Sequence, residues 1–316
     1  MSTPIIETKN LKKYFKVQKG LLHAVDDVNL IINQNETLGV VGESGCGKST
    51  LGRVIVRLLE ATSGQVLFNG DVIVGDGAKK SSNLYNDVQM IFQDPFSSLN
   101  PRLSVSDIIA EPIHVRKAIK GKAAIKEKVL DLMDTVGLPP RYVNIYPHEL
   151  DGGRRQRVGI ARALALNPKF IVCDEPVSAL DVSIQAQILN LIMDLQEKSG
   201  LAYMFVTHDL CVVKHISTNI MVMYMGQVVE YTQKNMLFEK QWHPYSQALL
   251  AAIPLPDMNI TRERIVLSGE VSSPINPKPG CRFAPRCKYV TDKCIGADIP
   301  LVEVEPNRKV ACTLYQ

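Results

Sequence analysis

The first part of the chain alternates short apolar runs with polar turns, a pattern typical of β-strands. Such runs lie at residues 5–6, 24–25, 28–32 and 38–41. They predict antiparallel strands that lead into a short buried strand over residues 37–41. Single strands are also predicted over residues 66–74, 88–92, 170–174 and 203–207, and a hairpin around Gly226.

Apolar positions recur at helical spacing further along the chain. Between residues 103 and 145 they predict a helical insertion of roughly 60 residues, interrupted at Pro112 and at Pro139-Pro140. Helices are also predicted over residues 51–59, 156–166, 183–199 and 244–253, and Gly200 ends the third of these. Strands that alternate with helices indicate an α/β core with a mostly parallel sheet.

Composition narrows the class of protein. The chain has 316 residues, 46% of them hydrophobic, which suits about two globular domains. It contains no apolar stretch of the ~18–20 residues that a membrane-spanning helix needs. Residues 1–10 lack the charged and apolar regions of a secretory signal. We therefore expect a soluble, intracellular protein, whose mild net charge of +4 indicates no particular partner.

The segment 42–50 fits the phosphate-binding pattern G-x-x-x-x-G-K-[ST] between a predicted strand and a predicted helix. Its glycines let the backbone N–H groups point inward, and the helix start adds its positive dipole end. Lys48 can reach the β- and γ-phosphates, and the Ser49 hydroxyl can bind Mg²⁺. The predicted nucleotide-binding residues are Gly42, Glu43, Ser44, Gly45, Cys46, Gly47, Lys48, Ser49 and Thr50.

Other polar residues follow predicted strands or begin a helix. Asp174 and Glu175 end an apolar strand, where a second Mg²⁺ ligand and a water-polarising carboxylate are expected in phosphate-loop proteins. Gly152-Gly153 at a helix start can bind an anion. Tyr14 and Phe15 are adjacent on a strand, so they point to opposite faces and only one can stack on an adenine.

With these motifs in this order, residues 4–250 resemble the ATP-binding subunits of ABC transporters. The resemblance implies a P-loop NTPase fold: a RecA-like core with an antiparallel β subdomain, and a helical subdomain at about residues 97–160. The roles that it implies are Gln93 in the Q-loop, Asp151, Gly152 and Gly153 in the signature motif, Asp174 in Walker B, Glu175 as general base, Asp181 in the D-loop, His208 as switch histidine, and Phe15, or else Tyr14, on the adenine.

The family also implies a mechanism and partners. Two cassettes face head to tail and sandwich ATP between the phosphate loop of one and the signature loop of the other. Ser49 and Asp174 hold Mg²⁺, and Gln93 senses this ion. Hydrolysis is coupled to an integral-membrane permease, to which a substrate-binding protein delivers the transported substrate. The second cassette is expected to be a paralogous subunit, or an identical one in isolation. The resemblance places the chain peripherally on the cytoplasmic face of the membrane and involves no nucleic acid.

Asp151 departs from the family pattern, which has serine there. A serine hydroxyl can donate to the γ-phosphate that the partner binds, whereas an ionised carboxylate cannot donate and repels phosphate. We expect a site completed by this signature loop to close poorly. A regulatory module with impaired hydrolysis is therefore an alternative function.

Four of the seven cysteines lie near the C-terminus: Cys281, Cys287, Cys294 and Cys312. With His243 to Leu250, they resemble the C-terminal extension of oligopeptide/dipeptide permease ATPases, here residues 251–316. Their spacing lacks the C-x₂-C pairs of zinc ribbons, so an iron–sulfur cluster, an irregular zinc site or unligated thiols are possible. The resemblance implies a [4Fe–4S] cluster, with Arg282, Arg286 and Lys288 offsetting its negative charge.

These features favour an ATPase subunit that powers import of di- or oligopeptides. A related importer of nickel or sugars is an alternative. A soluble ABC ATPase acting on ribosomes or in DNA repair is disfavoured, because such proteins usually carry two fused cassettes or a long coiled coil.

Overall fold

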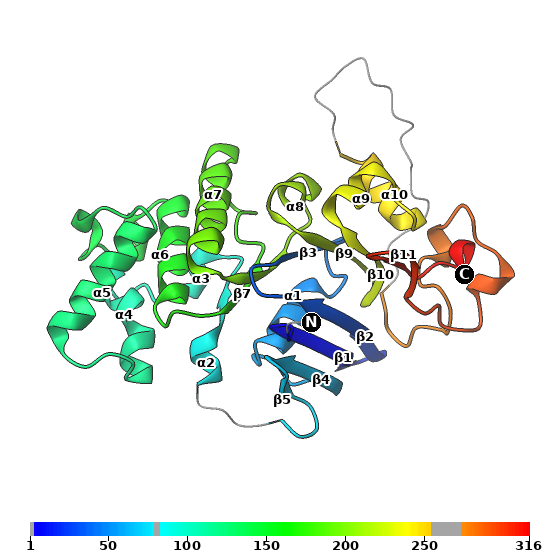
Figure 1. Cartoon of the computed structure of the whole chain (residues 1–316), viewed down its shortest axis with the longest axis horizontal. Helices are drawn as coiled ribbons and strands as arrows, with labels where there is room; N and C mark the ends of the chain where they lie inside the picture. The colour runs from blue at the N-terminus through cyan, green and yellow to red at the C-terminus, as the bar shows by residue number, and fades with distance from the viewer. Residues whose placement is uncertain (1–2, 79–82, 254–272) are drawn as a thin grey trace, which may run out of the picture. The chain divides into compact units, whose positions relative to one another are not determined.

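The computed structural model describes residues 3–78, 83–253 and 273–316, which form two compact units (Figure 1). Unit 1 comprises Met1–Lys79 and Phe205–Gln316, and unit 2 comprises Lys80–Met204. Within the described ranges, no helix is long and apolar enough to cross a membrane.

Unit 1 contains an antiparallel sheet of four strands in the order β2-β1-β4-β5. These strands are β1 (Ile6–Val17), β2 (Gly20–Ile32), β4 (Ser63–Phe68) and β5 (Asp71–Val74). The predicted antiparallel strands before residue 37 are confirmed. The prediction of one strand over residues 66–74 is wrong, because the chain reverses at Asn69-Gly70, where φ is 49° and 84°. Two positive φ values suit the two-residue turn of a tight hairpin.

The second sheet of unit 1 carries the strand that precedes the phosphate-binding segment. Its order is β11-β12-β10-β9-β3, with β3 parallel to β9. The strands are β3 (Thr37–Val41), β9 (Asn219–Tyr224), β10 (Gln227–Gln233), β11 (Val302–Glu305) and β12 (Arg308–Val310). Since β12 pairs with β10, the C-terminal segment extends the same sheet.

The helices of unit 1 are short. They are α1 (Lys48–Ile55), α8 (Leu210–Ile216), α9 (Lys234–Glu239) and α10 (Pro244–Ala251), with 3₁₀ turns η3 (Ala284–Arg286), η4 (Asp292–Cys294) and η5 (Thr313–Tyr315). The predicted helix at residues 244–253 and the hairpin at Gly226 are confirmed. The strands β11 and β12 and the helices α8 and α9 are not among the predicted elements.

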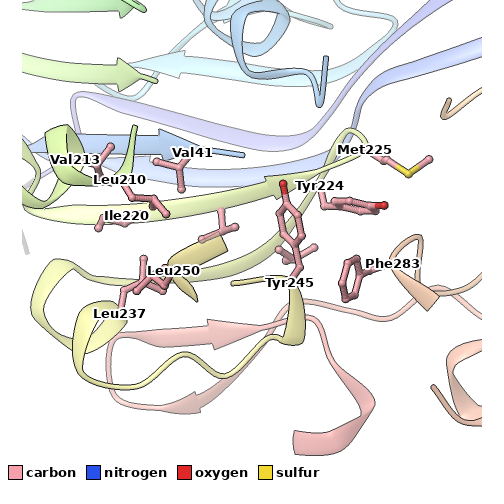
Figure 2. Packing of buried hydrophobic residues seen from close by; sticks show 12 residues of the cluster. Val41, Leu210, Val213, Ile220, Tyr224, Met225, Leu237, Tyr245, Leu250 and Phe283 are labelled. Atoms are coloured by element: carbon pink, nitrogen blue, oxygen red, sulfur yellow. The ribbon is translucent and has the colours of Figure 1, made fainter. Parts of the chain in front are cut away.

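An aromatic cluster joins the C-terminal extension to the core of unit 1 (Figure 2). The ring centroids of Tyr224 and Tyr245 lie 4.6 Å apart, and that of Phe283 lies 5.3 and 5.4 Å from them. Phe283 is almost fully buried. The extension therefore contributes to the same hydrophobic core as β9 and α10.

Unit 2 contains the predicted helical insertion. Its helices are α2 (Leu84–Asp87), α3 (Pro95–Ser98), α4 (Val105–Arg116), α5 (Lys122–Thr135), α6 (Gly152–Leu164) and α7 (Val182–Ser199), with η1 (Pro140–Tyr142) and η2 (Pro147–Glu149). The strands β6 (Val88–Ile91) and β7 (Phe170–Asp174) are parallel. The strand β8 (Ala202–Val206) spans the boundary between the units.

Two boundaries in unit 2 differ from the predicted ones. Pro112 lies inside α4 and does not interrupt it, because the flanking Ile109 and Ile113 are buried and hold the helix in place. The helix predicted from residue 156 begins at Gly152, because the Asp151 carboxylate accepts a hydrogen bond from the Arg154 N–H and caps it. The start of α7 and its end at Gly200, with φ 65°, agree with the prediction.

Candidate nucleotide-binding site

The phosphate-binding segment forms a tight loop between β3 and α1. Gly42, Gly45 and Gly47 all have positive φ, and a Cβ at Gly47 would lie 1.9 Å from the Ala24 carbonyl oxygen. The loop path therefore requires glycine at this position. The strand–loop–helix context that the pattern demands is confirmed.

Lys48 is buried and lies folded against its own loop. Its Nζ donates to the carbonyl oxygens of Gly42 at 2.7 Å and Glu43 at 2.9 Å, and it lies 3.7 Å from Cys46 Sγ. Burial raises the pKa of the Cys46 thiol. The Lys48 ammonium group therefore lies inside the loop to which phosphates are predicted to bind, bonded to carbonyl oxygens of that loop.

Residues distant in sequence hold Glu43 in place. Its backbone N–H donates to the Tyr245 hydroxyl at 2.8 Å. Arg286 Nη1 donates to both carboxylate oxygens, at 3.2 and 3.0 Å. The structure thus assigns Arg286 to an ion pair with the loop, a contact that the sequence did not indicate.

A second network surrounds Tyr14. Its ring stacks on His23 with centroids 3.8 Å apart, and its hydroxyl donates to Asp26, which also pairs with Arg282. Although burial opposes it, hydrogen bonds from Tyr14 and His23 lower the pKa of Asp26. Phe15 is half-buried on the same strand.

In unit 2, the predicted base and the Q-loop residue lie together. Asp174 is fully buried at the end of β7. Glu175 follows it with φ 46°, a left-handed conformation that is uncommon for residues other than glycine. Gln93 Nε2 donates to Glu175 Oε2 at 3.0 Å. This bond orients the carboxylate and leaves the Gln93 carbonyl oxygen available for another partner.

The signature and D-loop residues lie at helix starts in unit 2. Asp151 caps α6 and also pairs with the Arg154 guanidinium. A Cβ on Gly153 would lie 2.6 Å from Ile184 Cγ2, so α6 and α7 pack closely there. Asp181 Oδ1 accepts from the Ile184 N–H at 3.0 Å and caps α7. Both acidic side chains therefore set where a helix begins.

His208 lies in unit 1, exposed just after β8. The Thr207 N–H donates to the Val40 carbonyl at 3.1 Å, which puts His208 at the same sheet edge as the phosphate-binding loop. The predicted residues thus divide between the units. The loop, Tyr14, Phe15 and His208 belong to unit 1, whereas Gln93, Asp151 to Gly153, Asp174, Glu175 and Asp181 belong to unit 2.

The four C-terminal cysteines lie in one region of unit 1, each with a free thiol. Burial raises the pKa of the Cys281 thiol to about 11, to which the neighbouring Cys294 and Cys312 add, and burial together with Cys294 raises the pKa of Cys287. Cys281 and Cys294 also line a cavity of about 630 Å³. Yet no group of three or more His, Cys, Asp and Glu within residues 3–78, 83–253 and 273–316 could hold a metal ion. The arrangement therefore lends no support to a single zinc ion or to a preformed cluster site.

The sequence did not reveal the contacts of Tyr245, Arg282 and Arg286. The only signal in the sequence is a pair of arginines between Cys281 and Cys287, which are expected to offset the negative charge of an iron–sulfur cluster. In the structure Arg282 pairs with Asp26, and Arg286 pairs with Glu43.

Two known families match this chain. The ABC transporter family matches residues 25–178, and the C-terminal region of oligopeptide/dipeptide transporters matches residues 229–294.

Several relatives match along almost their whole length. The chain is 53% identical over 314 residues to the oligopeptide transport ATP-binding protein OppF of Bacillus subtilis, covering 99% of this chain and 97% of that protein. It is 44% identical over 317 residues to the dipeptide transport ATP-binding protein DppF of Haemophilus influenzae, covering 98% and 97%.

Two solved structures show the same fold. The dimeric post-hydrolysis state of the ATP-binding cassette MJ0796, bound to ADP and Pi, matches with a TM-score of 0.65 and 29% identity over 72% of this chain and 98% of that one. CbiO1 from Clostridium perfringens, part of the ABC transporter complex cbiONQ, matches with a TM-score of 0.66 and 26% identity over 76% and 92%.

Proposed function

This chain belongs to the ABC transporter ATPases, among the oligopeptide and dipeptide transport ATP-binding proteins, and from that premise we propose that it hydrolyses ATP to power uptake of di- or oligopeptides through a membrane permease. The observation that carries the proposal is the match of residues 229–294 to the C-terminal region of oligopeptide/dipeptide transporters. The family model is described as that of oligopeptide/dipeptide transporters. It favours peptides over the alternatives of nickel, sugar or a regulatory role.

The residues of the phosphate loop bind the triphosphate in this proposal. Lys48 leaves the carbonyl oxygens of Gly42 and Glu43 and donates to the β- and γ-phosphates instead. The backbone N–H groups from Gly45 to Thr50, with the start of α1, supply the remaining donors. Phe15 stacks on the adenine, since one face of the Tyr14 ring is already stacked on His23.

Hydrolysis is an in-line attack of water on the γ-phosphate. Glu175 accepts the proton of that water, with its carboxylate held by Gln93. His208 donates to the γ-phosphate. A bound Mg²⁺ would neutralise phosphate charge, and the donors proposed for it are the Ser49 hydroxyl, the Asp174 carboxylate and the Gln93 carbonyl oxygen, all of them oxygen ligands that this ion prefers.

The complete site requires a second cassette. We propose a head-to-tail pair with a paralogous ATPase, or with a second copy in isolation, in which Asp151, Gly152, Gly153 and Asp181 face the partner's nucleotide. The dimeric structure of the cassette MJ0796 supports the pairing of two cassettes. Because Asp151 cannot donate a hydrogen bond when ionised, the two sites of a heterodimer would hydrolyse ATP unequally.

A peripheral position on the cytoplasmic face of the membrane follows from the permease partner. Unit 2 exposes the apolar side chains of Phe96 and Val115 to 64% and 73%. Docking of the permease against this unit would cover them. In this proposal the helical subdomain is residues 97–160, and the C-terminal extension is residues 251–316.

A [4Fe–4S] cluster on Cys281, Cys287, Cys294 and Cys312 is a separate proposal, and it rests on donor chemistry alone. Four free cysteine thiols in one region of unit 1 are the kind of donor set that such a cluster uses. The absence of any group fit for a metal ion among the described residues weighs against it. Anaerobic purification tests it: a colourless protein without stoichiometric iron would refute it.

Transport itself tests the main proposal. The chain would be co-expressed with the permease and the partner ATPase and reconstituted in proteoliposomes with the binding protein. ATP should drive uptake of labelled peptides, and peptide-loaded binding protein should stimulate phosphate release. The same vesicles with Glu175→Gln serve as the control. Stimulation by nickel or by sugars in place of peptides would contradict the proposal.

A further inference from the structure

The C-terminal extension reaches into the phosphate-binding loop. Arg286, in the 3₁₀ turn between Cys281 and Cys287, pairs with Glu43 at 3.0 Å. The Arg286 side chain is 9% exposed and that of Glu43 is 27% exposed, so water screens this ion pair less than one at the surface. The two residues are 243 positions apart in the chain.

The arginine is itself firmly held. Burial acts to lower the pKa of Arg286, but hydrogen bonds with Tyr224 and Glu43 outweigh this effect and raise it. Phe283, three residues earlier, packs against Tyr224 and Tyr245 in the core of unit 1 (Figure 2). Tyr245 in turn accepts the backbone N–H of Glu43. The same aromatic cluster therefore supports both the arginine and the loop.

The charge of Glu43 explains why such support matters. Its carboxylate lies in a loop that must accept a triphosphate of about four negative charges. An unpaired carboxylate there would repel the ligand, and more strongly a triphosphate than a diphosphate. The guanidinium cancels that charge and keeps the side chain directed at the extension.

We propose that Arg286 is a positioning residue of the nucleotide site, which neutralises Glu43 and makes the C-terminal extension part of the phosphate-binding loop. The proposal rests on the proposed function in one respect, that the loop binds ATP. Because Arg286 directly precedes Cys287, a change in the conformation of the cysteine region would also move the residue that contacts Glu43.

The test is equilibrium binding of MgATP and MgADP by isothermal titration calorimetry. Arg286→Gln should weaken ATP binding about tenfold, and ADP binding less, because one charge pair in a partly buried site is worth roughly a factor of ten. Added salt should shrink the deficit. Lys309→Gln, which removes an exposed positive charge of the same extension, should bind ATP within about twofold of the parent chain.

A double-mutant cycle separates the electrostatic role from a merely structural one. If Arg286 acts by neutralising Glu43, the variant Glu43→Gln/Arg286→Gln regains ATP affinity to within about twofold of the parent. Arg286→Lys, which keeps the charge, should restore most of the affinity. A double variant that binds ATP as weakly as Arg286→Gln overturns the proposal.

Glu43→Gln alone decides the matter if Arg286→Gln does not fold. In this variant the positive charge of Arg286 is no longer neutralised by Glu43 and attracts the triphosphate, so ATP should bind about threefold more tightly. Unchanged or weaker binding would overturn the proposal. A parent chain that binds no ATP would instead refute the proposed function, so the two failures are distinguishable.

Discussion

Acidification should destabilise this protein through one buried histidine. His243 is 1% exposed and caps α10, where its Nδ1 accepts the Tyr245 N–H at 3.1 Å. Its own backbone N–H donates to Glu230 Oε2 at 3.0 Å. Burial lowers the pKa of His243 from 6.5 to about 3. The folded protein therefore keeps this ring neutral over a pH range in which the unfolded chain protonates it.

The sign and size of the effect follow from proton linkage. Between pH 6.5 and 3 the unfolded state binds one more proton at this residue, so the free energy of unfolding falls as pH falls. From pH 7.5 to pH 5 the loss is about 2 kcal/mol for this group alone. Because Tyr245 holds Glu43 in the phosphate-binding loop, loss of this cap would also loosen the predicted nucleotide site.

His243→Asn isolates the contribution, since asparagine also caps helices but does not titrate. Urea unfolding at pH 7.5 and pH 5 would measure the free energy of unfolding of both chains. The parent should lose about 2 kcal/mol more than the variant. His215→Gln, at an exposed position, is the matched control and should keep the parent's pH dependence.

Glu230 provides a check on the reasoning. Burial raises the pKa of this carboxyl, so its own contribution to stability is greatest at low pH and acts against that of His243. It is common to both chains and cancels in their difference. If parent and His243→Asn lose equal stability between pH 7.5 and pH 5, the buried neutral histidine is not the cause.

Three further substitutions probe the catalytic residues and the core. Glu175→Gln keeps the shape of the side chain but removes the base, so kcat for phosphate release should fall about 10²- to 10⁴-fold while ATP binding persists. Asp151→Ser keeps the cap of α6 and supplies a hydrogen-bond donor for the γ-phosphate, so ATPase activity of the homodimer should rise at least about tenfold. Unchanged turnover and unchanged ATP-driven dimerisation would contradict this prediction. Phe283→Ala removes a buried ring and should lower the free energy of unfolding by about 3–5 kcal/mol, measured by urea denaturation.

Most helices and strands of the fold could be predicted from local sequence patterns. The phosphate-binding loop, the helical insertion and the strand ending at Asp174 each depend on residues that are close in sequence, where periodicity and turn chemistry act directly. The errors lay where one residue decides a boundary. Asn69-Gly70 splits a predicted strand into a hairpin, and the cap at Asp151 moves a helix start by four residues, from 156 to 152.

The geometry within each half of the candidate site was less accessible from the sequence. The motifs identified Gln93 and Glu175 separately, but only the fold shows that they share a hydrogen bond. They are 82 positions apart, and no periodicity links residues across such a distance. The positive φ of Glu175 likewise depends on how β7 meets the turn that follows it.

The contacts of the C-terminal extension were also inaccessible from the sequence, because its partners are even further away along the chain. From the sequence alone, the crowded cysteines mark the extension as a separate module, and its arginines are expected to offset the charge of a cluster on those cysteines. In the structure Phe283 fills the core beside Tyr224, and Arg282 and Arg286 pair with Asp26 and Glu43. A group that binds or modifies the cysteines would therefore act on a segment already bonded to the phosphate-binding loop. The extension and the loop are thus in direct contact through Arg286 and Glu43, although 243 positions separate these two residues in the chain.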